Sequence, residues 1–242
     1  MIETLVGWHA VNALIQRYPK RIQALYALDS LAPARLDALQ NSGIKLNVLS
    51  KEQFFKTIKF DDAVAHQGVA ALAEASTVLP EGALPEHLTR VNPLVLALDG
   101  VTDPRNLGAI LRTAEAAGVD VVIQPKDNSA ALNSAARKTA CGAAELVPLV
   151  QVTNLKRTLE KLRKDGYWVS GAAGESDAVS MTQADLTGAR VLVMGSEGKG
   201  IRKSVREACD QLVAIPMLGA VSSLNVSVAT GILLYEALRQ RT

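Results

Sequence analysis

Three segments of this 242-residue chain concentrate the residue types that bind ligands and react: glycine, asparagine, serine and charged side chains. They are DGVTDPRNLGAILRTA (residues 99–114), VLVMGSEGKG (191–200) and AIPMLGAVSSLNVSVATGILLYEALRQ (214–240). Each contains or follows an apolar run with the pattern of a strand. Because loops at strand ends carry the chemistry of α/β enzymes, these segments are the first candidates for a functional site.

In the first segment, Asn106 and Arg112 lie six residues apart, on overlapping but not identical sides of a predicted helix. Arg112 falls within an apolar stretch, where a guanidinium needs a partner. A phosphate oxygen or a ribose hydroxyl would suit its fork of donors. A carboxylate partner, or an arginine stem that carries its charge to water, is an equally good interpretation of the same pattern.

The second segment is an apolar strand that runs into GSEGKG, including Gly195, Ser196 and Glu197. Glycines allow backbone amides to approach a ligand closely, although a simple tight turn has the same composition. Ile201 and Arg202 follow where a Walker phosphate loop requires Lys and Ser/Thr, and no GxGxxG is present. ATP, GTP and NAD therefore lose support as ligands.

In the third segment, Ser222, Ser223 and Asn225 stand at the start of a long apolar helix. The free amides of a helix N-terminus favour anions and polar ligands. Taken alone, these residues are first interpreted as an ordinary helix cap.

The prolines of residues 76–92 and Pro93 directly after them predict a linker between two domains, residues 1–75 and 93–242. The first domain reads as a small α/β unit. Its apolar spacing predicts helices near residues 9–15 and 34–39 and strands near 22–28, 44–49 and 69–72.

In the second domain, strands and helices alternate, which predicts a mainly parallel sheet with helices on both faces. Asp103 and Pro104 supply a helix N-cap and a first-turn proline. The expected strands are near 93–100, 119–125, 145–150, 167–174, 190–198 and 211–217, and the expected helices near 104–118, 129–142, 154–166 and 222–239.

Composition is that of an ordinary globular protein, with 48% hydrophobic and 21% charged residues. No apolar run is long enough to cross a bilayer, and the N-terminus does not read as a signal peptide, so we expect a cytoplasmic protein. Cys141 and Cys209 form no metal-ligand pattern and are expected to be two buried thiols. The net charge of +2 leaves RNA binding undecided. The basic residues of 156–164 at helical spacing predict a solvated helix face.

Taken together and in this order, the three segments closely resemble the signature motifs of the SPOUT class of RNA methyltransferases. The chain is most similar to the TrmH/SpoU-like branch, which methylates ribose 2′-oxygens, and within it to the bacterial enzymes that modify a guanosine of 23S ribosomal RNA. The upstream segment VAHQGVAA (64–71) shares this resemblance, which covers nearly the whole chain.

The resemblance implies a catalytic domain whose C-terminal segment is threaded into a deep trefoil knot. That would be an exception to the rule that chains avoid knots. It also implies a homodimer with a composite active site, and an N-terminal domain similar to a ribosomal RNA-binding protein. The cofactor implied is S-adenosylmethionine, and no metal is needed.

Carried over by motif, the backbone around Gly195, Ile215 and Leu224 holds S-adenosylmethionine, with Met217 as a further lining residue. The polar positions associated with catalysis and ribose placement are Asn106, Arg112, Glu197, Ser223 and Asn225. A guanidinium is a poor proton acceptor, so Arg112 is assigned to phosphate positioning and to stabilisation of the developing alkoxide. A role as the base stays open only for a site that strongly favours the deprotonated guanidine. Glu197 is the conventional carboxylate for orientation or proton transfer, or else accepts hydrogen bonds within its turn.

Two alternatives stay open: the same chemistry on transfer RNA, and a non-catalytic RNA-binding factor for ribosome assembly. His66 has two open roles, RNA contact and domain folding.

Overall fold

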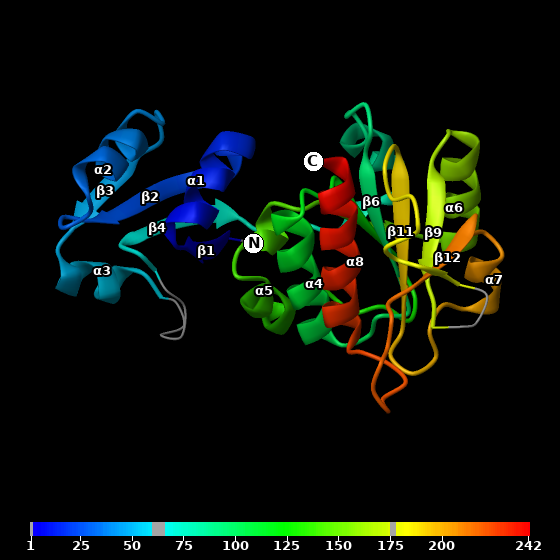
Figure 1. Ribbon diagram of the computed structural model, residues 1–242. Helices are drawn as coiled ribbons and strands as arrows, with labels where there is room; N and C mark the ends of the chain where they lie inside the picture. Colours follow the sequence, from blue (N-terminus) through cyan, green and yellow to red (C-terminus); the bar gives the residue numbers. More distant parts are fainter. Residues whose placement is uncertain (1, 60–65, 175–177) are drawn as a thin grey trace. The chain divides into compact units, whose positions relative to one another are not determined.

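The computed structural model describes residues 2–59, 66–174 and 178–242, and the chain divides into two compact units (Figure 1). Unit 1 comprises Met1–Thr77 together with Cys141–Leu146, and unit 2 comprises Val78–Ala140 together with Val147–Thr242. The segment predicted as a linker contributes strand β5 (Leu79–Pro80) and the 3-10 helix η2 (Glu81–His87) to unit 2. The short segment 141–146 joins unit 1 although, in sequence, it lies between the two parts of unit 2.

Unit 1 is a four-stranded sheet in the order β1-β4-β2-β3, with β1 and β2 antiparallel to β4 and β3 parallel to β2. Its elements are β1 (Ile2–Val6), α1 (Trp8–Arg17), β2 (Ile22–Leu28), α2 (Pro33–Gln40), β3 (Leu46–Leu49), α3 (Lys51–Thr57) and β4 (Val69–Glu74). The five elements expected from the sequence are confirmed. Strand β1 and helix α3 were missed.

A non-local ion pair ties segment 141–146 into unit 1. Glu145 is buried, pairs with Arg21 and accepts a hydrogen bond from the backbone amide of Ser76 at 2.6 Å. Leu146 joins the same apolar core as Leu14 and Leu25. This carboxylate is therefore paired with an opposite charge and hydrogen-bonded, as a buried charge must be.

The VAHQGVAA segment lies partly outside the described residues, but its HQG turn is defined. His66 Nδ1 accepts a hydrogen bond from the backbone amide of Gly68 at 3.0 Å, and its ring packs against Phe54 and Phe55. Gln67 Oε1 accepts a hydrogen bond at 2.9 Å from the backbone amide of Trp8, in the first turn of α1. These contacts give His66 and Gln67 a part in folding the unit.

Unit 2 is an eight-stranded sheet in the order β10-β12-β9-β11-β6-β7-β8-β5, in which every neighbouring pair is parallel. Its remaining elements are β6 (Leu94–Asp99), α4 (Pro104–Ala116), β7 (Val121–Pro125), α5 (Ser134–Ala140), β8 (Leu149–Val152), α6 (Leu155–Lys164), β9 (Trp168–Ala172), β10 (Val179–Ser180), β11 (Arg190–Gly195), α7 (Lys203–Arg206), β12 (Gln211–Ala214) and α8 (Val226–Arg241). Helices α4, α5 and α8 cover one face of the sheet, and α6 and α7 cover the other (Figure 1). The predicted α/β fold with a parallel sheet is confirmed, and the trefoil knot stays a prediction from the resemblance.

Strand β6 explains why these strands read as continuous apolar runs. All of its residues are buried, and Val95 and Ala97 belong to the core that also contains the apolar face of α6. A strand covered by helices on both faces has no polar side, so its hydrophobic pattern does not alternate.

Two local expectations are wrong. The strand expected near 145–150 begins only at Leu149, because 143–145 form a 3-10 helix (η3, Ala143–Glu145). Cys141 is exposed, not buried. Cys209 is half-buried, and its burial raises the pKa of its thiol to about 12, which keeps it protonated and unreactive.

None of the helices in the described part of the chain is long and apolar enough to cross a membrane.

Candidate active site

A cavity of about 290 Å³ opens at the carboxyl ends of β9, β11 and β12. Its wall consists of the strand ends, the glycine-rich loop after β11 and the segment before α8. The lining residues are Ala172, Ala173, Gly174, Met194, Gly195, Ser196, Glu197, Gly198, Gly200, Val213, Ile215, Met217, Ser222, Ser223, Leu224, Val226 and Ala229. From β6 the sheet continues to β7 and β8 on one side, and strands β11, β9 and β12 lie on the other side. The strand order therefore reverses at β6, and the cavity lies beside this point. Ligands of open α/β sheets bind at such points.

The glycine-rich loop folds back on itself at the cavity wall. Ser196 and Gly200 exchange two backbone hydrogen bonds of 3.0 and 2.9 Å. A Cβ atom on Gly195 would overlap the backbone of Gly200 and Ile201. Position 195 therefore requires glycine for a close approach of backbone to backbone within a tight turn, which is the alternative that the sequence left open beside close approach to a ligand.

Three polar side chains from different segments meet at the mouth of this loop. Asn106 Nδ2 donates to Glu197 Oε1 at 3.1 Å, and Asn225 Nδ2 donates to Asn106 Oδ1 at 3.0 Å and also to Glu197 Oε1. No lysine or arginine of the described residues lies at ion-pair distance from Glu197, and its Oε2 has no hydrogen-bond partner among them. One carboxylate oxygen is thus held by two carboxamides, and the other can accept a further hydrogen bond.

Asn225 has the capping role that the sequence left open, and a second one. Its Oδ1 accepts hydrogen bonds from the backbone amide of Ser227 at 2.9 Å and from the Ser227 hydroxyl at 2.6 Å, which caps α8. Its Nδ2 reaches Glu197. The helix start thereby fixes the orientation of a side chain at the cavity.

The other residues singled out by sequence divide into two groups. Ser223, Gly195, Ile215, Leu224 and Met217 all line the cavity. Arg112 does not: it is exposed on α4, because the residues that face the core of the unit are its neighbours Ile110, Leu111 and Ala114. This exposure agrees with the alternative interpretation, in which the arginine stem carries its charge to water.

Sequence reasoning missed the residues that anchor the loop, Asp99 and Arg202. Asp99 is 1% exposed at the end of β6, and its Oδ2 accepts a hydrogen bond from the Arg202 backbone amide at 2.8 Å. Its Oδ1 accepts from Arg202 Nε at 2.7 Å and lies 2.6 Å from Nη2. The signal was present in the sequence as a carboxylate that ends an otherwise apolar strand.

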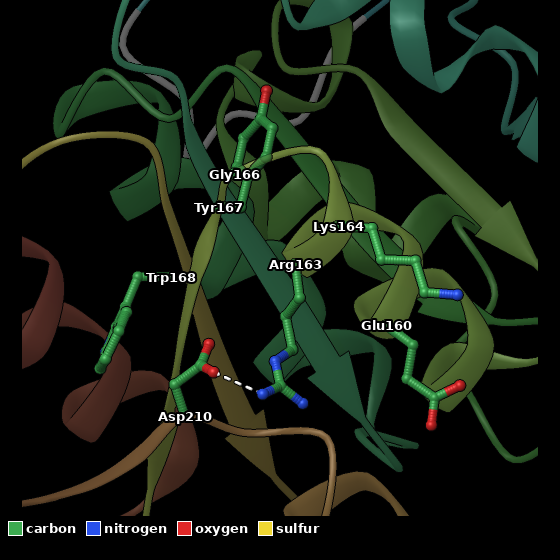
Figure 2. A pocket seen from close by; sticks show the side chains of 7 residues that line it. All are labelled: Glu160, Arg163, Lys164, Gly166, Tyr167, Trp168 and Asp210. Atoms are coloured by element: carbon green, nitrogen blue, oxygen red, sulfur yellow. Dashed lines mark ion pairs between the residues drawn. The ribbon is translucent and has the colours of Figure 1, made fainter.

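A larger hollow of about 590 Å³ lies at the amino ends of the strands, where Trp168 begins β9 and Asp210 precedes β12 (Figure 2). Arg163 pairs with Asp210 there at 2.7 Å. On the same helix, Lys156 and Arg157 pair with Glu207 and Glu81. The basic cluster of α6 is therefore largely a surface of ion pairs, and none of the three motifs contributes to this hollow.

Within residues 2–59, 66–174 and 178–242, no three His, Cys, Asp or Glu side chains are grouped as a metal site would require.

Comparison with known proteins gives a consistent result. A family described as "SpoU rRNA Methylase family" matches residues 93–235. The chain is 53% identical over 244 residues to the "23S rRNA (guanosine-2'-O-)-methyltransferase RlmB" of Pseudomonas aeruginosa, with 99% of this chain and 97% of the relative covered. It is 49% identical to the enzyme of the same name from Escherichia coli K12, with both chains covered completely.

Solved structures agree in fold. A putative RNA methyltransferase of the TrmH family from Porphyromonas gingivalis has 29% identity and a TM-score of 0.68, with 99% of this chain and 89% of that chain covered. The SpoU methyltransferase AviRb from Streptomyces viridochromogenes, solved with AdoMet, has 23% identity and a TM-score of 0.71, with 99% and 90% covered.

Proposed function

The chain belongs to the SpoU rRNA methylase family, and we propose that it transfers a methyl group from S-adenosylmethionine to the 2′-oxygen of a guanosine ribose in 23S ribosomal RNA. The observation that carries this proposal is the full-length match at about half identity to 23S rRNA guanosine methyltransferases, together with a cavity lined by the motif residues. The enzyme acts in the cytoplasm, where ribosomal RNA is found.

The chemistry of the cavity supports S-adenosylmethionine as the cofactor. Glycines leave backbone amide and carbonyl groups uncovered for the polar ends of such a molecule, and Ile215, Met217 and Leu224 offer apolar walls for an adenine ring. A volume of about 290 Å³ lies just below the usual range for small-molecule sites, roughly 300–1,000 Å³. When bound, the cofactor supplies a sulfonium methyl group that a nucleophilic oxygen can attack.

The protein's own task is to align the ribose hydroxyl and to handle its proton. Glu197 lines the cavity with one carboxylate oxygen held and the other available, so it can accept the hydrogen bond of the attacking hydroxyl. Asn106 and Asn225 keep that carboxylate oriented, and Ser223 lies in the same wall. Arg112 stabilises the negative charge that develops on the oxygen and positions the neighbouring phosphate.

We assign RNA recognition outside the catalytic site to the N-terminal domain, residues 1–75, with 93–242 as the catalytic domain. Its separate core and its compactness as unit 1 support this assignment.

A homodimer is the second part of the proposal, and the outer face of α8 supports it. Val228 and Tyr235 lie two turns apart on this helix, and each side chain is 52% exposed. A helix that is apolar on its exposed side normally has a partner. We expect the double variant, with both Val228→Asp and Tyr235→Asp, to sediment as a monomer and the wild type as a dimer in sedimentation velocity. Two charges cannot be buried unpaired in an apolar interface.

The control for the dimer is Val91→Asp, which makes the same change at a valine that is 94% exposed in unit 2. It should leave the sedimentation coefficient unchanged. A wild-type protein that sediments as a monomer, or a double variant that sediments as a dimer, would refute the assignment of this interface.

The proposed function is tested by methyl transfer from labelled S-adenosylmethionine to ribosomal and transfer RNA from a strain that lacks this protein, followed by nuclease mapping. We expect label in one 2′-O-methylguanosine of large-subunit RNA and none in the same RNA from the parent strain, where the site is already methylated. Label in transfer RNA alone would keep the chemistry and overturn the target. Saturable cofactor binding with no label on any RNA or assembly intermediate would favour a non-catalytic RNA-binding factor.

A further inference from the structure

Asp99 lies beside both ends of the loop that carries Glu197. Asp99 is the register partner of Gly195 across the β6–β11 pair, so the loop leaves the sheet beside it. At the other end, the carboxylate binds the backbone amide and the guanidinium of Arg202. The loop between these two points has no regular structure beyond the Ser196–Gly200 bridge.

The contacts with Arg202 compensate for the desolvation of the buried Asp99 carboxylate. A carboxylate that is 1% exposed is unfavourable unless charge and hydrogen bonds satisfy it, and within the described chain Arg202 supplies the hydrogen bonds that the Asp99 carboxylate accepts. The guanidinium itself is 53% exposed, but its Nε and Nη2 are aimed at Asp99. Arg202 is therefore oriented toward the sheet and away from a ligand in the cavity, whose lining does not include it.

We propose that the Asp99–Arg202 ion pair is the positioning device for Glu197: it sets the loop so that the Glu197 carboxylate meets Asn106 and Asn225. Arg202 then acts on methyl transfer through Glu197 and does not contact RNA. This inference rests on the proposed function for its kinetic readout and on the loop geometry for its structural one.

The test measures the single-turnover methylation rate at saturating RNA and cofactor. Arg202→Met and Arg202→Lys are each introduced into the wild-type protein and into the Glu197→Gln variant. Residues that act as a unit are strongly non-additive. We expect Arg202→Met to lower the rate roughly tenfold or more in the wild-type background and less than about threefold in Glu197→Gln. Arg202→Lys should recover part of the loss, because an ammonium can still pair with Asp99 but without the bidentate fork.

A second readout does not depend on activity. Amide hydrogen exchange of the 195–202 segment in the full-length protein should become faster in Arg202→Met, because the loop loses its anchor. The matched control is Lys203→Met, which removes the adjacent exposed cation. It should change neither the rate nor the exchange by more than about twofold.

Three outcomes would overturn the proposal. Equal rate losses in both backgrounds would mean that Arg202 acts independently of Glu197. A weaker RNA affinity with an unchanged saturated rate would make Arg202 a direct RNA contact. Unchanged exchange in Arg202→Met would show that the ion pair does not hold the loop, whether or not the wild type methylates 23S RNA.

Discussion

Gly195→Ala is expected to weaken S-adenosylmethionine binding by roughly tenfold to a hundredfold, since overpacking costs about 1–3 kcal/mol and 1.4 kcal/mol is tenfold in affinity. The added methyl group would overlap the backbone of Gly200 and Ile201, which no rotamer change can relieve. The loop must then move away from the strand end, taking one wall of the cavity and Glu197 with it. Isothermal titration of the full-length protein with S-adenosylmethionine measures this loss, and thermal unfolding checks that the variant is folded.

Gly219→Ala is the matched control, because it makes the same change in the segment before α8. A Cβ atom at Gly219 meets no atom within 4 Å. We expect its cofactor affinity within about twofold of the wild type, as for an exposed substitution. If a folded Gly195→Ala bound the cofactor as tightly as Gly219→Ala, the cavity at the end of β11 would not be the cofactor site.

Local patterns predicted the elements that present the site. The apolar run of β6 and the Asp103-Pro104 start of α4 were both readable, and Asp103 does cap that helix, accepting a hydrogen bond from the Arg105 amide at 2.8 Å. Helix α3 could also have been found, because Ser50 and Gln53 form a capping box that is visible as S-x-x-Q. These features depend on residues within one turn of each other.

The contacts that make the site were not readable, because they join residues far apart in sequence. Asn106 and Glu197 are 91 residues apart, and Asp99 and Arg202 are 103 apart. A buried carboxylate at a strand end indicates that a partner exists but not which of many arginines it is. The motif resemblance brought Asn106, Glu197 and Asn225 together only because it carries three-dimensional knowledge, and it left out Asp99 and Arg202, whose contribution is to hold the loop.

The exposure of Arg112 leads to the second large effect. We expect Arg112→Ala to lower the single-turnover rate about 10²–10³-fold, as loss of one group that stabilises developing charge does in other enzymes. Cofactor affinity should stay within about twofold of wild type, because Arg112 is not part of the cavity lining. Near-normal turnover in a folded Arg112→Ala variant would remove this residue from the mechanism.

A composite site would explain why a residue with this role lies exposed on a single chain, and mixed dimers test it. Arg112→Ala and Glu197→Gln subunits are co-expressed with different tags and the heterodimer is purified. If Arg112 of one subunit serves Glu197 of the other, one of the two sites carries both changes and the other carries neither. The heterodimer should then recover about half of the wild-type rate, although each homodimer is nearly inactive. If both residues serve the same subunit's site, each site in the heterodimer keeps one defect and the rate stays as low as in the homodimers. Recovery would thus place the guanidinium across the dimer interface, and no recovery would require α4 to bring Arg112 to its own cavity when RNA binds.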